Sequence, residues 1–342
     1  MYGIYNKKNL NLIILKILWE HTDETHPLMQ QEIVKLVKRE YGLEIDRRSV
    51  KNNVDALREL FEGTSYEIST EGGYRLSGRE FDDSELRMLI DSVLFSKTLS
   101  NNQAKTLIQK LKKLSNRYFN VKVKHICNLP ELQHSDNKQI MYNIDALNDA
   151  IALKKKVSFV YNEYQTDFKL YPKKTQKYVV NPYQMVASNG RYYLIGNYDK
   201  YDDISHYRID KITDIKILDE RIKDVKLVPE MEKGLNLPKH MAEHIYLFSG
   251  KSENIKFLAD KNLMTELIDW FGKDFRILKE TENQLLISIR CNVKAMRYWA
   301  LQYGPYVEIV EPKTLRKQLI EDIESMYSRY RKEVNFYDEI FK

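Results

Sequence analysis

The densest run of β-forming sequence places the tightest limit on the fold. Five short segments rich in valine, isoleucine and tyrosine lie between Val157 and Leu218, and a turn containing Asn189 and Gly190 separates two of them. The segments are residues 157–161, 178–187, 191–197, 204–210 and 214–218. Five strands joined largely by tight turns are typical of a small antiparallel barrel. We therefore expect a five-stranded β-barrel in this part of the chain.

Two adjacent tyrosines in the third of these segments raise the first question about function. Successive strand residues point to opposite faces, so Tyr192 and Leu194 share one face while Arg191 and Tyr193 share the other. If one face meets the barrel core, the other face needs a different partner.

The next strand carries a matching pair of basic side chains. His206 and Arg208 are two residues apart and so lie on one face. A guanidinium binds phosphate through paired hydrogen bonds, and an aromatic ring stacks on a base. With the arginine and tyrosine of the preceding strand, they predict a binding surface for a nucleic-acid or nucleotide effector. The alternative is that the tyrosine only fills barrel surface and that Arg208 pairs with Asp210 or Glu163.

Residues 1–80 show three amphipathic helices followed by a hairpin. Apolar residues recur at helical spacing in residues 10–18, 29–41 and 46–61, and a hairpin across residues 66–76 comes next. Helix, helix, helix and hairpin is the element order of a winged helix-turn-helix, a domain that reads double-stranded DNA.

The third of these helices carries the side chains expected of a DNA reader. With Val50, Val54 and Leu57 inward, its other face presents groups suited to base edges and phosphates. The predicted DNA-binding residues are Arg47, Arg48, Ser49, Lys51, Asn52 and Arg58 on the helix and Arg75 in the hairpin. The alternative is a small helical domain used for protein contacts.

Residues 81–142 are expected to form a helical linker. Helices are predicted from Asp82 and over residues 102–118, and residues 130–139 are polar and unpatterned. From Ser92 to Pro130 there are eight lysines and arginines and no carboxylate. This run favours a polyanionic partner over a membrane, although a solvated helix face has the same composition. The linker helices could touch flanking DNA phosphates or cross with those of a partner subunit in a homodimer.

The barrel region resembles the WYL domain of bacterial transcriptional regulators. The resemblance rests on Pro182 followed by YQMV, on NGRYYLIG and on HYRIDKI, in that order. It implies an Sm-like five-stranded barrel over residues 143–225 that binds nucleic acid or nucleotides. Tyr192 stands where the family has tryptophan, and Lys211 stands where it has a second arginine. Lys211 belongs to the expected effector site, but an ammonium lacks the fork of a guanidinium.

Residues 240–335 are expected to form a C-terminal ferredoxin-like α/β domain, so the fold class is α+β. The elements read β-α-β-β-α-β and then a helix over residues 314–331, which resembles the extension that often follows a WYL domain. A stripe from Leu315 to Tyr330 is predicted to pack that helix on the sheet. Arg290 could complete the effector site or could be a solvated residue at a strand end.

One pattern indicates metal chemistry. His240, Glu243 and His244 match H-x-x-E-H, in which two histidines on a helix bind zinc and a glutamate acts as base. The context is poor, because no long helix carries the motif. The sequence contains no phosphate-binding loop of the G-x-x-x-x-G-K type, and no nucleophile has a recognisable setting. We therefore expect no enzyme activity and no cofactor.

Composition and motifs together favour a ligand-responsive DNA-binding regulator. The apolar runs are far shorter than a bilayer span, and the N-terminus lacks the apolar core of a signal peptide, so a cytoplasmic protein without membrane contact is expected. The first alternative is an accessory factor that binds single-stranded RNA or DNA and modulates a defence nuclease. A metal hydrolase ranks third.

Overall fold

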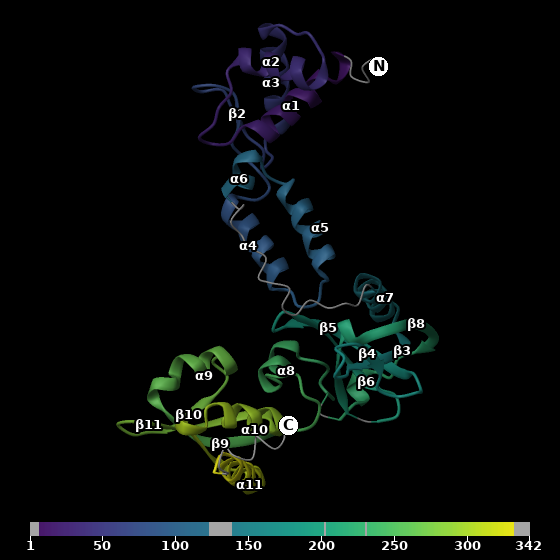
Figure 1. The fold of residues 1–342 in the computed structure, drawn as a ribbon, viewed down its shortest axis with the longest axis vertical. Helices are drawn as coiled ribbons and strands as arrows, with labels where there is room; N and C mark the ends of the chain where they lie inside the picture. The colour runs from purple at the N-terminus through teal and green to yellow at the C-terminus, as the bar shows by residue number, and fades with distance from the viewer. Residues whose placement is uncertain (1–6, 123–138, 202, 230, 332–342) are drawn as a thin grey trace, which may run out of the picture. The chain divides into compact units, whose positions relative to one another are not determined.

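The computed structural model describes residues 7–122, 139–201, 203–229 and 231–331. The chain divides into two compact units, Met1–Lys138 and Gln139–Lys342, whose elements are labelled in Figure 1. The fold is α+β, because helices dominate the first unit and two antiparallel sheets the second. Most of the predicted polar linker, residues 130–139, lies outside the described residues. Across the described ranges, no helix has the length and hydropathy needed to cross a membrane.

Three helices and a two-stranded hairpin begin the first unit, in the predicted order. They are α1 (Leu10–His21), α2 (Gln30–Tyr41), α3 (Arg47–Phe61), β1 (Ile68–Ser69) and β2 (Arg75–Leu76). Their apolar faces share one core that includes Ile14, Val54 and Leu76. The Thr22 hydroxyl donates to the Leu18 carbonyl at 2.5 Å and accepts from the Leu76 amide at 3.0 Å. This buried hydroxyl ties the hairpin to α1.

Three further helices follow, where the sequence predicts two. They are α4 (Asp83–Phe95), α5 (Asn101–Lys112) and α6 (Arg117–Lys122). The prediction of one helix to Tyr118 is wrong because Asn116 starts a new helix. Its side-chain oxygen accepts from the backbone amides of Tyr118 at 2.8 Å and Phe119 at 2.9 Å, the bonds of a helix N-cap. Phe119 then packs on Leu86 and Ile90 of α4.

A curled antiparallel sheet dominates the first half of the second unit. It consists of β3 (Lys155–Tyr164), β4 (Leu170–Pro172), β5 (Tyr178–Ser188), β6 (Arg191–Tyr198), β7 (Ile204–Arg208) and β8 (Ile212–Arg221), after helix α7 (Ile140–Leu153). The order is β4-β3-β5-β6-β7, and β8 pairs with β3. The described strands of this sheet number six and form a half-barrel. The five-stranded Sm-like barrel stays a prediction. The 3₁₀ turn Ile209–Lys211 carries the chain from β7 to β8, which pairs with β3.

Two backbone features fix the hairpin between β5 and β6. Asn189 and Gly190 both have positive φ, 50° and 75°, as a tight hairpin turn requires. At Gly196 a Cβ atom would lie 2.7 Å from a Val180 methyl carbon and 2.8 Å from the Asn181 carbonyl oxygen. Only glycine allows β5 and β6 to approach this closely.

Apolar clusters cover both faces of β6. Leu194 packs in the core with α7, while Ile195 belongs to a second cluster with Val228 and Leu247 from the segment after β8. That segment contains the short helix α8 (Leu237–Glu243). Tyr193 is half-buried against the second cluster, so both faces of this strand are covered.

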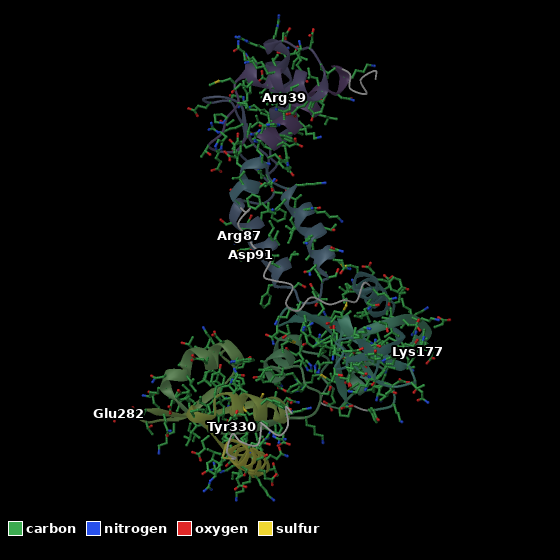
Figure 2. The ribbon with its side chains drawn as sticks, in the orientation of Figure 1. Arg39, Arg87, Asp91, Lys177, Glu282 and Tyr330 are labelled. Atoms are coloured by element: carbon green, nitrogen blue, oxygen red, sulfur yellow. The ribbon has the colours of Figure 1, made fainter. Side chains whose placement is uncertain are left out.

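The last domain has the predicted element order. It comprises β9 (Ser252–Asp260), α9 (Met264–Phe271), β10 (Arg276–Glu280), β11 (Gln284–Asn292), α10 (Val293–Gln302), β12 (Val307–Glu311) and α11 (Lys313–Tyr330). Its sheet order β10-β11-β9-β12 is that of a split βαβ, ferredoxin-like arrangement. The predicted stripe on α11 is only half buried. Leu315 and Leu319 are buried, whereas Ile323, Met326 and Tyr330 are exposed. Figure 2 labels Tyr330 near the end of this helix.

Candidate functional site

The exposed face of α3 contains the residues predicted to read DNA. Asp46 caps the helix by accepting the Ser49 amide at 2.6 Å, and Val50, Val54 and Leu57 point into the core. The opposite face therefore lies in solvent. Its exposed members are Arg47, Arg48, Lys51, Asn52 and Arg58, while Ser49 is half-buried. In the part of the chain that the structure describes, none of these four cations forms a salt bridge, so all four guanidinium and ammonium groups are available to a polyanion.

Arg75 of the hairpin differs from these residues. Its Nη1 donates to the Glu71 carbonyl at 2.9 Å, and the side chain is half-buried. This bond bridges the turn between β1 and β2. Part of the hydrogen-bonding capacity of Arg75 is therefore used within the hairpin.

Two arginines of the curled sheet are held by one buried carboxylate. Asp210 is 1 % exposed, and its Oδ2 accepts from Arg191 Nη1 at 2.9 Å and from Arg208 Nη2 at 2.7 Å. Its Oδ1 accepts from Arg208 Nε at 3.1 Å, so the contact with Arg208 is bidentate. The two arginine side chains keep 20 % and 24 % of their surface exposed. Two guanidinium groups against one carboxylate leave an excess positive charge.

Two tyrosines border this group. Tyr193 lies directly opposite Arg208 in the β6–β7 pairing, and burial raises the pKa of its hydroxyl. Tyr161 accepts the Arg208 backbone amide at 3.2 Å, and burial raises the pKa of this hydroxyl to about 12. Both phenols therefore stay protonated at neutral pH. They supply neutral rings and hydroxyl groups beside the arginines.

Lys211 adds a further cation next to Arg208. Burial and the neighbouring positive charge of Arg208 lower the pKa of Lys211. The ammonium lies 5.8 Å from the centre of the Tyr164 ring, within the range of a cation–π contact. We use the name arginine cluster for Arg191, Tyr193, Arg208, Asp210 and Lys211.

His206 belongs to a different contact. It shares a sheet face with Arg208, as predicted, but its Nε2 lies 2.8 Å from Nε2 of His240 on α8. His244 packs its ring 4.2 Å from that of His240. Burial lowers the pKa of His206 to about 2, and burial together with His244 lowers the pKa of His240 to about 3. These two neutral histidines join β7 to α8 through one hydrogen bond.

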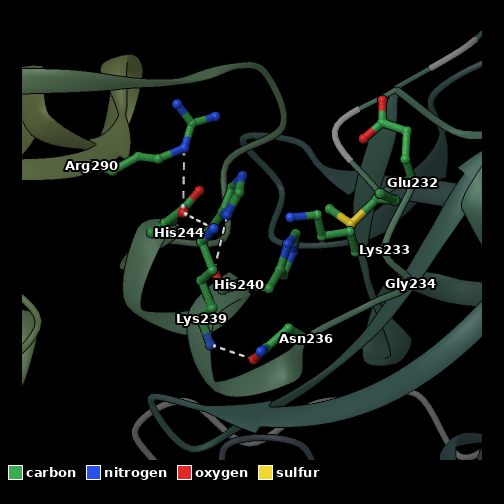
Figure 3. Close-up of a pocket in the computed structure, with 10 residues that line it drawn as sticks. Glu232, Lys233, Gly234, Asn236, Lys239, His240, His244 and Arg290 are labelled. Atoms are coloured by element: carbon green, nitrogen blue, oxygen red, sulfur yellow. Dashed lines mark hydrogen bonds and ion pairs between the residues drawn. The ribbon is translucent and has the colours of Figure 1, made fainter.

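Arg290 pairs with α8. Its Nε lies 3.4 Å from Glu243 Oε1, and Lys239 approaches the same oxygen at 3.8 Å. Figure 3 shows Arg290, His240 and Lys239 around a pocket of about 370 Å³ in this region. The carboxylate lies within ion-pair range of both cations. This pairing gives Arg290 a role in the contact between α8 and β11.

The first four residues of the H-x-x-E-H motif lie on the seven-residue helix α8, and His244 is its C-cap. His240 uses Nε2 toward His206, and His244 Nδ1 lies 2.9 Å from the His240 carbonyl oxygen. Within the described ranges, the group that brings at least three potential ligand atoms within 4.8 Å of one another is Glu20, His21 and Glu40. The motif residues do not form such a group.

The predicted site residues did not include Asp210 of the arginine cluster or its neighbour Tyr161. Asp210 was visible only as a possible partner of Arg208, and its bond to Arg191 depends on the β6–β7 register. Tyr161 lies on β3, and the curl of the sheet brings its hydroxyl to the Arg208 amide. An acidic residue directly after two strand-face basic residues was the available indication for Asp210.

Comparisons with known proteins match two domain models to the chain and find several similar solved structures. Residues 142–217 match the WYL domain model, and residues 254–327 match the WCX domain model. No curated protein matches the chain.

The similar solved structures share little sequence with the chain. Proteasome accessory factor B/C (PafBC) of Arthrobacter aurescens is 12 % identical with a TM-score of 0.30, covering 95 % of this chain and 49 % of that one. A CRISPR Cas-related protein is 14 % identical with a TM-score of 0.37, covering 90 % of this chain and 80 % of that one. The chain thus spans about half the length of the PafBC chain.

Proposed function

We propose that this chain, which carries a WYL domain and a WCX domain, is a transcriptional regulator that reads double-stranded DNA and senses a nucleic-acid or nucleotide effector. The arginine cluster carries the sensing part of the proposal. A carboxylate fixes two guanidinium groups beside a neutral tyrosine, and the group has more positive than negative charge. In this proposal the chain is a binding protein without enzyme activity or cofactor.

The chemistry of the cluster suits a phosphate linked to a base. Each guanidinium has five N–H donors, and Asp210 occupies one of Arg191 and two of Arg208 in the bonds described above. On Arg208, the three remaining donors can bond phosphate oxygens. The Tyr193 ring lies opposite Arg208 and offers a stacking surface for a base.

The DNA-reading part rests on α3. Four exposed cations and Asn52 share its solvent face, and arginine, lysine and asparagine are suited to phosphates and to guanine and adenine edges. Genome-wide mapping of binding sites is the direct test. A compact set of palindromic sites supports the regulator, whereas their absence favours an accessory factor that binds single-stranded nucleic acid.

The effector site is tested by operator binding with and without short single-stranded oligonucleotides or cyclic dinucleotides. Tyr193→Ala removes a stacking contact of about 1 to 3 kcal/mol per base, and Arg208→Ala removes a charge-assisted bond of about 1.5 to 3 kcal/mol. Both variants are expected to lose the effector response while keeping operator affinity. The matched control is Tyr192→Ala, because Tyr192 is exposed on the other face of β6.

The outcomes separate sensing from a structural role. If the parent protein binds none of these oligonucleotides or cyclic dinucleotides, the cluster is not the sensor. The same conclusion follows if the variants respond to them as the parent does. Thermal stability of each variant must equal that of the parent before the comparison is made.

We further propose a homodimer, supported by the exposed apolar side chains of α11. Ile323, Met326 and Tyr327 are exposed along its second half. Closed twofold dimers are the commonest oligomers of soluble proteins, and paired half-sites suit DNA readers. Light scattering is expected to give a dimer mass for the parent and a smaller mass for Met326→Glu. A parent mass that stays monomeric at all concentrations, with and without DNA, contradicts the dimer.

A further inference from the structure

A cationic pocket lies in the N-terminal unit. None of its lining residues belongs to α3 or to the arginine cluster. It has a volume of about 890 Å³ and is lined by the C-terminal half of α1, the end of α5 and the start of α6. Lys16, Lys112, Lys113 and Arg117 line it, against one acidic residue, Glu20. The lining therefore has a clear excess of positive charge.

The pocket contains buried polar atoms that have no partner in the described structure. Ser115 is 5 % exposed, and its hydroxyl forms no hydrogen bond. The Asn120 side-chain oxygen is also buried without a partner. Unpaired buried polar groups cost roughly 1 to 3 kcal/mol each, so native proteins seldom retain them without a reason. Both residues line the pocket, where a ligand could satisfy them.

The two unpaired groups define the complementary ligand. A serine hydroxyl can donate to a phosphate oxygen, whereas the amide oxygen of Asn120 can only accept. A ligand that satisfies both carries an anionic acceptor and a hydroxyl or amino donor. Inorganic phosphate also carries a P–OH donor near neutral pH, but a sugar phosphate offers hydroxyl donors at several distances from its anionic oxygens and so can reach both atoms.

Arg117, an exposed cation of the pocket, is held in place through α1 and α2. Arg117 Nη1 lies 2.9 Å from His21 Nδ1, and since a guanidinium only donates, this ring nitrogen accepts. The proton of the neutral ring is then on Nε2, which lies 3.2 Å from Glu40 Oε1. This chain of contacts fixes the direction of the Arg117 side chain. Trp19 adds an aromatic wall and donates its ring N–H to the Lys113 carbonyl at 3.2 Å.

We propose that this pocket binds a small sugar-phosphate ligand, of which a mononucleotide is the form that also uses the Trp19 wall. Because the pocket joins α1 of the three-helix core to α5 and α6, a bound ligand would cross-link these helices. Ligand occupancy would thereby restrain the DNA-reading helices relative to the linker helices. The pocket does not depend on the function proposed for the arginine cluster.

The test is calorimetric titration of the full chain with inorganic phosphate, ribose 5-phosphate and adenosine monophosphate. An Arg208→Ala background removes the proposed effector site, so the heat reports on the N-terminal pocket. We expect the two esters to bind and inorganic phosphate to bind at least roughly tenfold more weakly, because it makes fewer of the required bonds. Ser115→Ala and Lys112→Ala should each weaken ester binding roughly tenfold.

The matched control for Lys112→Ala is Lys105→Ala. Lys105 is an exposed lysine that also lies on α5 but does not line the pocket. Ser115→Ala keeps the Cβ atom, and an unchanged melting temperature confirms that it folds. Equal losses for Lys105→Ala and Lys112→Ala would reduce the effect to general charge and overturn the proposal. Absence of binding by all three probes at millimolar concentration would overturn it as well, as would phosphate binding that equals ester binding.

Discussion

The exposed face of α3 and the arginine cluster are both cationic, but they hold their charges in different ways. On α3, Arg47, Arg48 and Lys51 extend into solvent without a salt bridge in the described structure. In the cluster, Arg191 and Arg208 are mostly buried and share the Asp210 carboxylate. Long exposed side chains adapt to a polyanion but lose conformational freedom when they bind. A fixed pair has already lost that freedom and suits one ligand geometry.

The two surfaces should also differ in how strongly salt concentration affects binding. Contacts between exposed cations and nucleic-acid phosphates weaken steeply as salt concentration rises, because binding releases counterions. Partly buried charges are screened much less. We therefore expect operator binding at α3 to depend more strongly on salt than effector binding at the cluster. Substitutions at the two surfaces and a change of pH test this difference.

Removing the shared carboxylate should have the largest effect. Asp210→Asn leaves two mostly buried guanidinium groups without their counter-charge, which is expected to cost about 3 kcal/mol of unfolding free energy. Chemical denaturation followed by circular dichroism measures the loss. The control is Asp214→Asn on β8, which breaks only an exposed ion pair with Lys177 and should cost far less than the loss of the buried Asp210 carboxylate. Equal losses for the two variants would show that Asp210 does not organise the cluster.

Acidification should destabilise the histidine contact beside the cluster. The pKa of His206 is lowered to about 2 and that of His240 to about 3, against 6.5 in the unfolded chain. As pH falls below 6.5, the unfolded chain takes up protons that the folded chain does not, so stability is lost from pH 6.5 down toward pH 3.

Denaturation midpoints at pH 7 and pH 5 measure this effect. Relative to His206→Phe, the parent should lose about 2 kcal/mol more over the interval, which corresponds to one histidine. If parent and variant lose the same amount, His206 is not buried in its neutral form.

The smallest effects are expected at the proposed DNA-binding residues of α3 and the hairpin. Lys51→Ala should lower the slope of log affinity against log salt by about one, because one phosphate contact is lost. Arg75→Ala should change that slope by less, since Arg75 already donates to the Glu71 carbonyl. Fluorescence anisotropy with an operator duplex at several salt concentrations measures both. A slope unchanged by Lys51→Ala, as in the control Lys279→Ala on β10, would remove α3 from the proposed interface.

Local pattern was enough to predict most elements and several members of the site. Helical spacing identified α1, α2 and α3 because each buries one face in a common core. Strand alternation predicted that Arg191 and Tyr193 share one face of their strand and that His206 and Arg208 share one face of the next. In the β6–β7 register Tyr193 lies opposite Arg208. The break between α5 and α6 was missed, because a single asparagine cap decides it within an otherwise helical composition.

Most elements, and the face on which each strand residue lies, could be read from the sequence, since both depend on interactions between near neighbours in the chain. Which groups meet depends on tertiary contacts. The β6–β7 register brings Arg191 to Asp210, and α8 places His240 within 2.8 Å of His206. The open edge between β7 and β8 and the half-exposed stripe of α11 likewise depend on contacts between distant segments. Such contacts leave no periodic trace in one sequence, because their free energy depends on packing between elements rather than on spacing within one.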